Sequence, residues 1–82
     1  MAEEIELIHA TQTWLDEDWI GELCLRLRAG ESLPPISLSQ YGKDLFCADG
    51  HHRLSAYLRE GRKTIPATVK KGTGRKPRAT WR

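Results

Sequence analysis

The residues with the greatest chemical capacity form one run near the middle of the chain, Asp49-Gly50-His51-His52-Arg53. The run lies where an apolar segment gives way to a helical pattern, which predicts a strand leading directly into a helix. Glycine admits close approach of a backbone or a ligand, and the first N–H groups of a helix have no partner within it. The helix dipole adds positive charge, and the planar fork of Arg53 can hold two phosphate oxygens. The run therefore predicts a phosphate-binding site made by Gly50, His51, His52 and Arg53.

The acidic and imidazole side chains of this run leave several roles open. His51 and His52 can donate hydrogen bonds when protonated and can transfer protons, so with Asp49 they are candidate catalytic groups. Asp49 could also hold Mg²⁺ through a bound phosphate, or cap the helix. We expect no zinc site, because adjacent side chains rarely converge on one ion and such a site needs three or four ligands.

The composition is that of an ordinary soluble domain of 82 residues with a net charge of +2. No apolar run approaches the ~20 residues of a membrane span, and the first residues are acidic where a signal peptide is basic. We therefore expect a cytoplasmic protein without a membrane partner. Cys24 and Cys47 lie in apolar patterns without C-x-x-C spacing, which predicts free, buried thiols.

Charge is divided unevenly along the chain. Residues 1–31 carry eight acidic and two basic side chains, a balance of −6, whereas residues 32–82 carry eleven basic and three acidic ones, a balance of +8. Residues 70–82 form a basic segment that we expect to be a flexible tail, either solvated or bound to a polyanion. Its candidate contacts to nucleic-acid phosphates are Lys70, Lys71, Arg75, Lys76, Arg78 and Arg82.

The surrounding pattern predicts the elements that position the run. Ile5, Leu7 and Ile8 indicate a short first strand. A helix follows within residues 11–31, capped by Thr13 or Asp16 and ended by Gly30. Its apolar stripe recurs at helical spacing and consists of Trp19, Ile20, Leu23, Cys24 and Leu27.

The second half of the chain predicts two further strands, a second helix and a last strand. The strands over 36–41 and 45–48 are joined by a turn at 42–44, the helix runs from 51 to Gly61, and the last strand covers 64–69. Pro66 marks this last strand as an edge strand. The order strand-helix-strand-strand-helix-strand gives an α+β class, with one small domain over residues 1–69 that has two main helices and a short mixed sheet.

The stretch "LPPISLSQYGKDLFCADGHHRLSAYLREGRKTIPATV" resembles the N-terminal domain of the ParB family, within the ParB/sulfiredoxin superfamily. The similarity covers about residues 5–69 and implies nucleotide phosphate binding at the helix start. ParB proteins bind CTP with a Gly-Glu-Arg-Arg sequence, which Gly50 and Arg53 match. Sulfiredoxins use Gly-Cys-His-Arg to bind ATP and attack a sulfinic acid. Because His51 stands at the position of their cysteine and Cys47 is no substitute, the resemblance argues against that reaction.

Asp49–Arg53 reproduce the Asp-Gly-His-His-Arg motif of the free-serine kinases of this superfamily. Those enzymes are much longer and need an early catalytic glutamate, for which Glu6 is the candidate. The segments that supply their serine pocket, and the DNA-binding and dimerisation regions of ParB, have no counterpart in this sequence.

Three functions follow from the residues and the resemblance together. The first is a small ParB-like module that binds a nucleotide or another phosphate ligand, with Mg²⁺, at the DGHHR helix start. The second is a nucleic-acid-binding accessory protein that uses the basic tail. The third is a phosphotransferase or nuclease-like enzyme that uses His51 and His52, although no nucleophile is evident and catalysis is left open. A domain this small could dimerise to complete a site.

Overall fold

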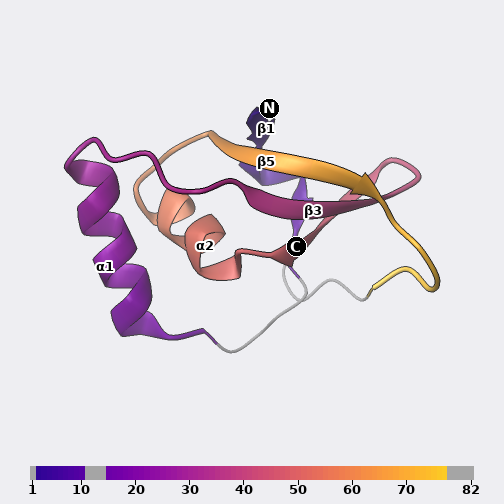
Figure 1. Cartoon of the computed structure of the whole chain (residues 1–82), viewed down its shortest axis with the longest axis horizontal. Coiled ribbons are helices and arrows are strands. Elements are labelled where there is room, and N and C mark those ends of the chain that lie inside the picture. Colours follow the sequence, from indigo (N-terminus) through magenta and orange to yellow (C-terminus); the bar gives the residue numbers. More distant parts are fainter. Residues whose placement is uncertain (1, 11–14, 78–82) are drawn as a thin grey trace.

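The computed structural model describes residues 2–10 and 15–77, in which five strands and two α-helices form one α+β domain (Figure 1). This confirms the predicted class, with its short mixed sheet and two main helices. Thr13, Trp81, Arg78 and Arg82 lie outside the described residues. The elements are β1 Ala2–Glu4, a 3-10 turn η1 Ile5–Leu7, β2 Ile8–His9, α1 Glu17–Arg28, β3 Ile36–Tyr41, β4 Asp44–Asp49, α2 His51–Arg59 and β5 Thr64–Lys71.

The sheet is built around β3, and its strand order is β1-β5-β3-β4-β2. The hairpin of β3 and β4 turns at Gly42, which adopts a positive φ of 62°. On the other side, β3 pairs in parallel with β5, which requires a crossover, and α2 supplies it. Alternation along β3 buries Ile36 and Leu38 completely, so the sheet turns this face toward the helices.

The two helices form a layer in which α2 packs on β3 and β5 and α1 packs on α2 (Figure 1). The predicted stripe of α1 is buried at Ile20, Leu23, Cys24 and Leu27. Asp16 is the N-cap of α1, as predicted. Both helices end in a Schellman motif at a glycine with positive φ, of which Gly30 was predicted as the stop of α1.

The prediction of one strand through Ile5, Leu7 and Ile8 is wrong. The 3-10 turn η1 separates β1, which pairs with β5, from β2, which pairs with β4 at the opposite edge of the sheet. The chain must cross between these edges, and the N–H of Ile5 donates to the carbonyl of Lys63 at 2.9 Å on the way. A single continuous strand could not pair at both edges.

The prediction that Pro66 marks an edge strand is also wrong, because β5 lies between β1 and β3. The sheet accommodates the missing N–H through the register of pairing. Pro66 is opposite Ala2 of the three-residue β1, and pairing with β3 begins one residue later, at Ala67. The proline therefore precedes the β3–β5 ladder rather than interrupting it.

The first part of the basic segment belongs to the folded domain. Strand β5 continues through Lys71, two residues past the predicted boundary at residue 69. After it, the N–H of Gly72 donates to the carbonyl of Gln40 at 2.7 Å, and the Tyr41 hydroxyl donates to the carbonyl of Thr73 at 2.9 Å. Lys76 forms an ion pair with Asp44. Residues 72–77 thus fold back on the β3–β4 hairpin instead of leaving the sheet.

Candidate functional site

The junction between β4 and α2 depends on glycine at position 50. Gly50 is the N-cap of α2 with φ 102° and ψ 29°, in the left-handed region that residues with a Cβ rarely adopt. A Cβ at this position would lie 2.5 Å from Cγ2 of Ile36 and 3.1 Å from a terminal nitrogen of Arg53. The sequence predicted that a backbone or a ligand could approach Gly50 closely. In the structure, the group that lies close to Gly50 is the side chain of Ile36 on β3.

A hollow of about 540 Å³ opens at this junction, between the starts of α1 and α2. Its volume lies within the range of small-molecule sites, about 300–1,000 Å³. The hollow brings together the whole DGHHR run, one face of α1 and the segment before β3. The lining residues are Trp19, Leu23, Arg26, Leu33, Pro34, Ala48, Asp49, Gly50, His51, His52 and Arg53.

The start of α2 offers hydrogen-bond donors to this hollow. Gly50 is the N-cap of α2 and makes no side-chain hydrogen bond to it, so the predicted capping role of Asp49 is not realised, whereas Asp16 caps α1. Arg53, on the first turn, has a side chain 24% exposed, and within the described residues its buried Nε has no hydrogen-bond partner. Its terminal nitrogen lies 3.8 Å from a carboxylate oxygen of Asp49, whose side chain is 81% exposed. An anion at this place could accept a hydrogen bond from the Nε of Arg53.

His51 and His52, although adjacent, occupy different environments. His51 is buried, and burial lowers its pKa, as does the neighbouring His52, while Asp49 opposes both effects. A His with a lowered pKa is neutral at pH 7. It can then donate one hydrogen bond to a ligand but adds no positive charge.

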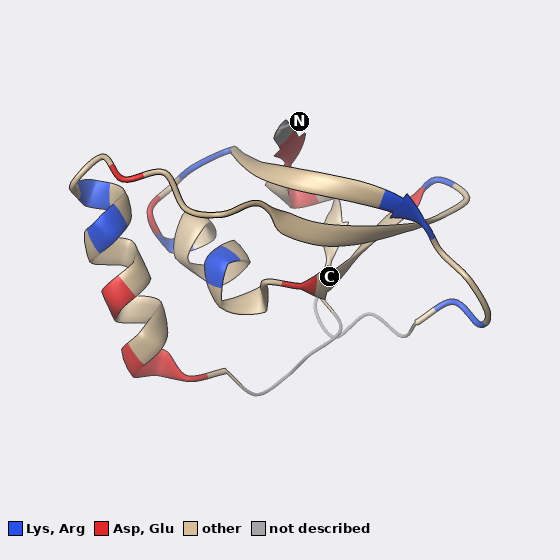
Figure 2. Cartoon of the chain, in the orientation of Figure 1, with Lys and Arg blue, Asp and Glu red and all other residues tan. Residues whose placement is uncertain are grey.

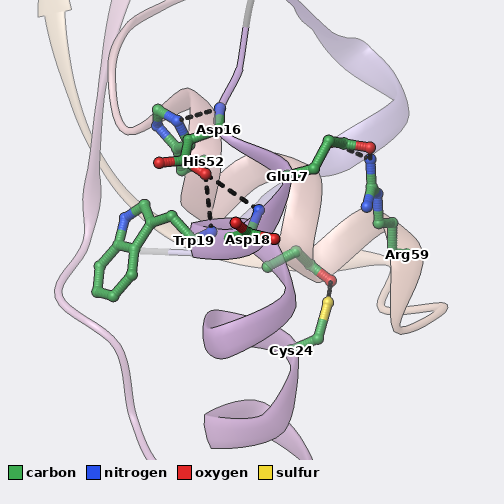
Figure 3. Close-up of polar contacts among 8 residues, drawn as sticks. Asp16, Glu17, Asp18, Trp19, Cys24, His52 and Arg59 are labelled. Carbon is green, nitrogen blue, oxygen red and sulfur yellow. Dashed lines mark hydrogen bonds and ion pairs between the residues drawn. The ribbon is translucent and has the colours of Figure 1, made fainter.

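His52 joins the start of α2 to the start of α1 (Figure 3). Its Nε2 accepts a hydrogen bond from the backbone N–H of Asp16 at 3.0 Å. The carboxylate of Asp16 in turn accepts from the N–H groups of Asp18 at 3.0 Å and Trp19 at 3.2 Å. A ring nitrogen accepts through its lone pair, so Nε2 carries no proton in this contact.

Charged side chains add two further links between the helices. Arg59 donates to both carboxylate oxygens of Glu17, the shorter contact being 2.7 Å, and Arg28 donates to Glu60 at 2.8 Å. The hydrogen bond from Arg28 lowers the pKa of the Glu60 carboxyl. Both partners come from the other helix, 42 and 32 residues away, so no local pattern could reveal them.

The described residues supply no nucleophile to the hollow. Cys24 and Cys47 are buried thiols, as predicted, and burial raises the pKa of Cys47 to about 12, which keeps it protonated. Glu6, the candidate kinase-type glutamate, lies on η1 and lines a different hollow with Leu58 and Arg62. In residues 2–10 and 15–77 no three His, Cys, Asp or Glu side chains are grouped so that they could hold a metal ion.

Of the predicted nucleic-acid contacts, the four that the structure describes do not line this hollow and lie near the far end of β5 (Figure 2). Lys70 and Lys71 end β5, and Arg75 and Lys76 follow in the segment that folds back on the hairpin. Lys76 forms an ion pair with Asp44, and its Nζ lies 5.8 Å from the ring centroid of Phe46.

No helix in the described part of the chain is both long and apolar enough to cross a membrane.

Sequence reasoning missed the contribution of α1 to the hollow. Trp19 was predicted as part of a buried stripe, yet it is 42% exposed and faces the DGHHR run with Arg26. The sequence could have indicated this exposure, because Trp19 lies on the first turn of the helix, directly after three acidic residues, and a helix end is often solvent-accessible.

The fold and the strand-glycine-helix start define a small α+β domain of the ParB/sulfiredoxin type, as the sequence predicted. The chain belongs to the family of the ParB N-terminal domain, whose model matches residues 3–80. No curated protein matches the chain.

Three similar structures show how the fold is used elsewhere. Sulfiredoxin from Arabidopsis thaliana is 26% identical with a TM-score of 0.74, over 88% of this chain and 86% of that one. C-terminally truncated ParB from Caulobacter crescentus, complexed with CTP-gamma-S, is 23% identical with a TM-score of 0.74, over 89% and 44%. A mutant free serine kinase in complex with ADP is 17% identical with a TM-score of 0.73, over 85% and 30%. The chain therefore spans less than half of the ParB and kinase structures.

Proposed function

We propose that this protein is a nucleotide-binding module that holds the phosphates of its ligand at the start of α2. The observation that carries the proposal is Arg53 on the first turn of α2, whose buried Nε has no partner in the described residues. Proteins of the same fold have been solved with CTP-gamma-S and with ADP, which supports a nucleotide rather than another anion.

Each residue of the run has a distinct task in this proposal. Gly50 lets the chain turn so that the first N–H groups of α2 face the hollow, where they donate to phosphate oxygens. Arg53 donates through Nε and its terminal nitrogens, exchanging its 3.8 Å contact with Asp49 for a closer one with the ligand. The neutral His51 donates a single hydrogen bond, and His52 fixes α1 against this turn.

The exposed carboxylate of Asp49 fits a magnesium ion carried by the phosphates. Mg²⁺ in nucleotide sites is usually held by one or two carboxylates together with phosphate oxygens and waters, so one acidic residue suffices. When bound, the ion would neutralise charge on the phosphates. We expect nucleotide affinity to fall when Mg²⁺ is removed, and to fall less in an Asp49→Asn variant.

Calorimetry with ATP, ADP and CTP in the presence of Mg²⁺ tests the proposal. Hydrogen bonds to charged groups contribute about 1.5–3 kcal/mol, so Arg53→Ala should weaken binding about 10- to 150-fold. Arg75→Ala is the matched control, because it removes the same charge from an exposed position outside the hollow. If no nucleotide binds, or if both variants bind as the wild type does, the proposal is wrong.

A second candidate function, nucleic-acid binding, is favoured by the basic end of the sheet. Lys43 on the hairpin turn, Lys70, Lys71 and Arg75 gather there, and Asp44 is already paired with Lys76 (Figure 2). Truncated ParB of the same fold has been solved complexed to the centromeric parS site. Binding of duplex DNA should weaken steeply with salt, and each lysine or arginine replaced by alanine should reduce the salt slope by about 1. Arg53→Ala should leave this binding unchanged, and salt-independent association would refute it.

A further inference from the structure

The hollow beside α2 has a second half that phosphate binding does not use. Opposite the DGHHR run, it is walled by Trp19, Leu23, Leu33 and Pro34. Leu23 and Leu33 are buried in the core, but Trp19 keeps 42% of its surface exposed although it is the largest side chain there. An exposed aromatic ring in a pocket next to an anion site is characteristic of ligands that carry both an apolar ring and a charged group.

One hydrogen bond holds the backbone of Trp19, and one cation–π contact holds its ring. Its backbone N–H donates to the Asp16 carboxylate at 3.2 Å, and Asp16 is held by His52 (Figure 3). The guanidinium carbon of Arg26 lies 5.5 Å from the ring centroid, in cation–π contact. The indole in Figure 3 extends from the first turn of α1 on the same side as the His52 ring. The ring is therefore positioned before any ligand arrives, which reduces the entropy lost on binding.

We propose that Trp19 is the surface on which the base of the bound nucleotide stacks, so that the hollow recognises a nucleoside phosphate rather than a phosphate alone. This inference rests on the proposed function. Every base has a π-face, so the stacking selects for a base without choosing among the four. The phosphates lie at the start of α2 and the base lies against α1, with the His52–Asp16 hydrogen bond fixing the distance between the two halves.

The test compares two ligands that share a phosphate chain, ATP and inorganic tripolyphosphate, each with Mg²⁺. Base–aromatic stacking contributes about 5- to 150-fold in affinity, so Trp19→Ala should weaken ATP by this factor and leave tripolyphosphate unchanged. Trp19→Phe retains an aromatic ring and should bind ATP within about three-fold of the wild type. Leu25→Ala is the matched control, since Leu25 is an exposed apolar side chain of α1, 59% accessible, outside the hollow.

If the Trp19→Ala variant does not fold, a fluorescence measurement tests whether the base of the nucleotide stacks on Trp19. The chain has three tryptophans, so Trp14→Phe and Trp81→Phe leave Trp19 as the single reporter. ATP should quench its emission with the same midpoint as calorimetry, whereas tripolyphosphate should not quench it.

Failure of this inference and failure of the proposed function give different results. If wild-type protein binds neither ATP nor tripolyphosphate, phosphate binding at α2 is wrong. If ATP binds and Arg53→Ala weakens its binding as expected, but Trp19→Ala binds ATP like the wild type or weakens both ligands equally, only the stacking surface is wrong. Emission from Trp19 that does not respond to bound ATP leads to the same conclusion.

Discussion

Replacing Gly50 by alanine tests the geometry on which the site depends. The new Cβ would lie 2.5 Å from Cγ2 and 2.8 Å from Cβ of Ile36, which is fully buried and cannot move aside. Overpacking of this kind costs about 1–3 kcal/mol, and the left-handed backbone adds about 1–2 kcal/mol for a residue with a Cβ. We therefore expect Gly50→Ala to lower the free energy of unfolding by about 2–5 kcal/mol. That is a large share of the about 4–12 kcal/mol expected for a domain of this size.

Gly30→Ala is the control that separates the two contributions. Gly30 also has a positive φ, 83°, but a Cβ there would meet nothing within 4 Å. It should cost only the backbone share, about 1–2 kcal/mol. Both changes reduce the entropy of the unfolded chain equally, so this effect cancels in the comparison. The difference between the two variants, about 1–3 kcal/mol, measures the contact between position 50 and Ile36.

Urea unfolding followed by circular dichroism gives both free energies, and equal m-values would show that the unfolded states are comparable. Gly50→Ala should also lose nucleotide affinity, because a Cβ 3.1 Å from Arg53 displaces its guanidinium. If Gly50→Ala costs no more than Gly30→Ala, β3 does not restrict the junction and the reasoning is refuted.

Three further predictions concern the titratable groups. Because burial lowers the pKa of His51, this residue takes up a proton at higher pH in the unfolded state than in the folded state. The free energy of unfolding should therefore decline below about pH 6.5. An equal decline in the free energy of unfolding of a His51→Gln variant would contradict this. His52→Ala should lose about 0.5–1.5 kcal/mol and speed amide exchange at Asp16, while His52→Gln, which keeps an acceptor, should lose less; unchanged exchange at Asp16 in His52→Ala would exclude the contact. Cys47, with a pKa of about 12 and no exposed surface, should resist iodoacetamide at pH 8 until the protein unfolds, and rapid alkylation of native protein would show that the thiol is accessible.

Local signals in the sequence predicted most of the helices and their ends. The stripe of α1, its cap at Asp16 and its stop at Gly30 all depend on residues within a few positions of one another. Hydrophobic spacing and capping act at this range, so they can be interpreted without knowing the rest of the fold.

Strand partners could not be predicted in the same way. The pairing of β1 with β5 joins residues about sixty positions apart, and nothing in Ile5 or Leu7 indicates that the chain must cross to the opposite edge of the sheet. Likewise, Pro66 cannot donate a backbone hydrogen bond, but the sequence does not show which neighbouring strand lies on that side of the residue. Its neighbour Ala67 pairs with β3 without interference.

The site shows the same division. Gly50 and Arg53 could be proposed as site residues from the motif alone, because their capacities come from the backbone and the guanidinium themselves. Trp19 and Arg26 could not, because they reach the hollow only through the packing of α1 on α2.

The two adjacent histidines have different surroundings because successive residues of a helix point in different directions. His51 is buried beside the hollow, and burial lowers its pKa, while His52 reaches across to the N-cap of α1. The DGHHR run therefore does more than present donors to phosphate: its fourth residue also determines where Trp19 stands. On the proposals made above, a change at His52 should affect base recognition more than phosphate recognition, although His52 contacts no base. That dependence would distinguish a positioning residue from one that binds the ligand directly.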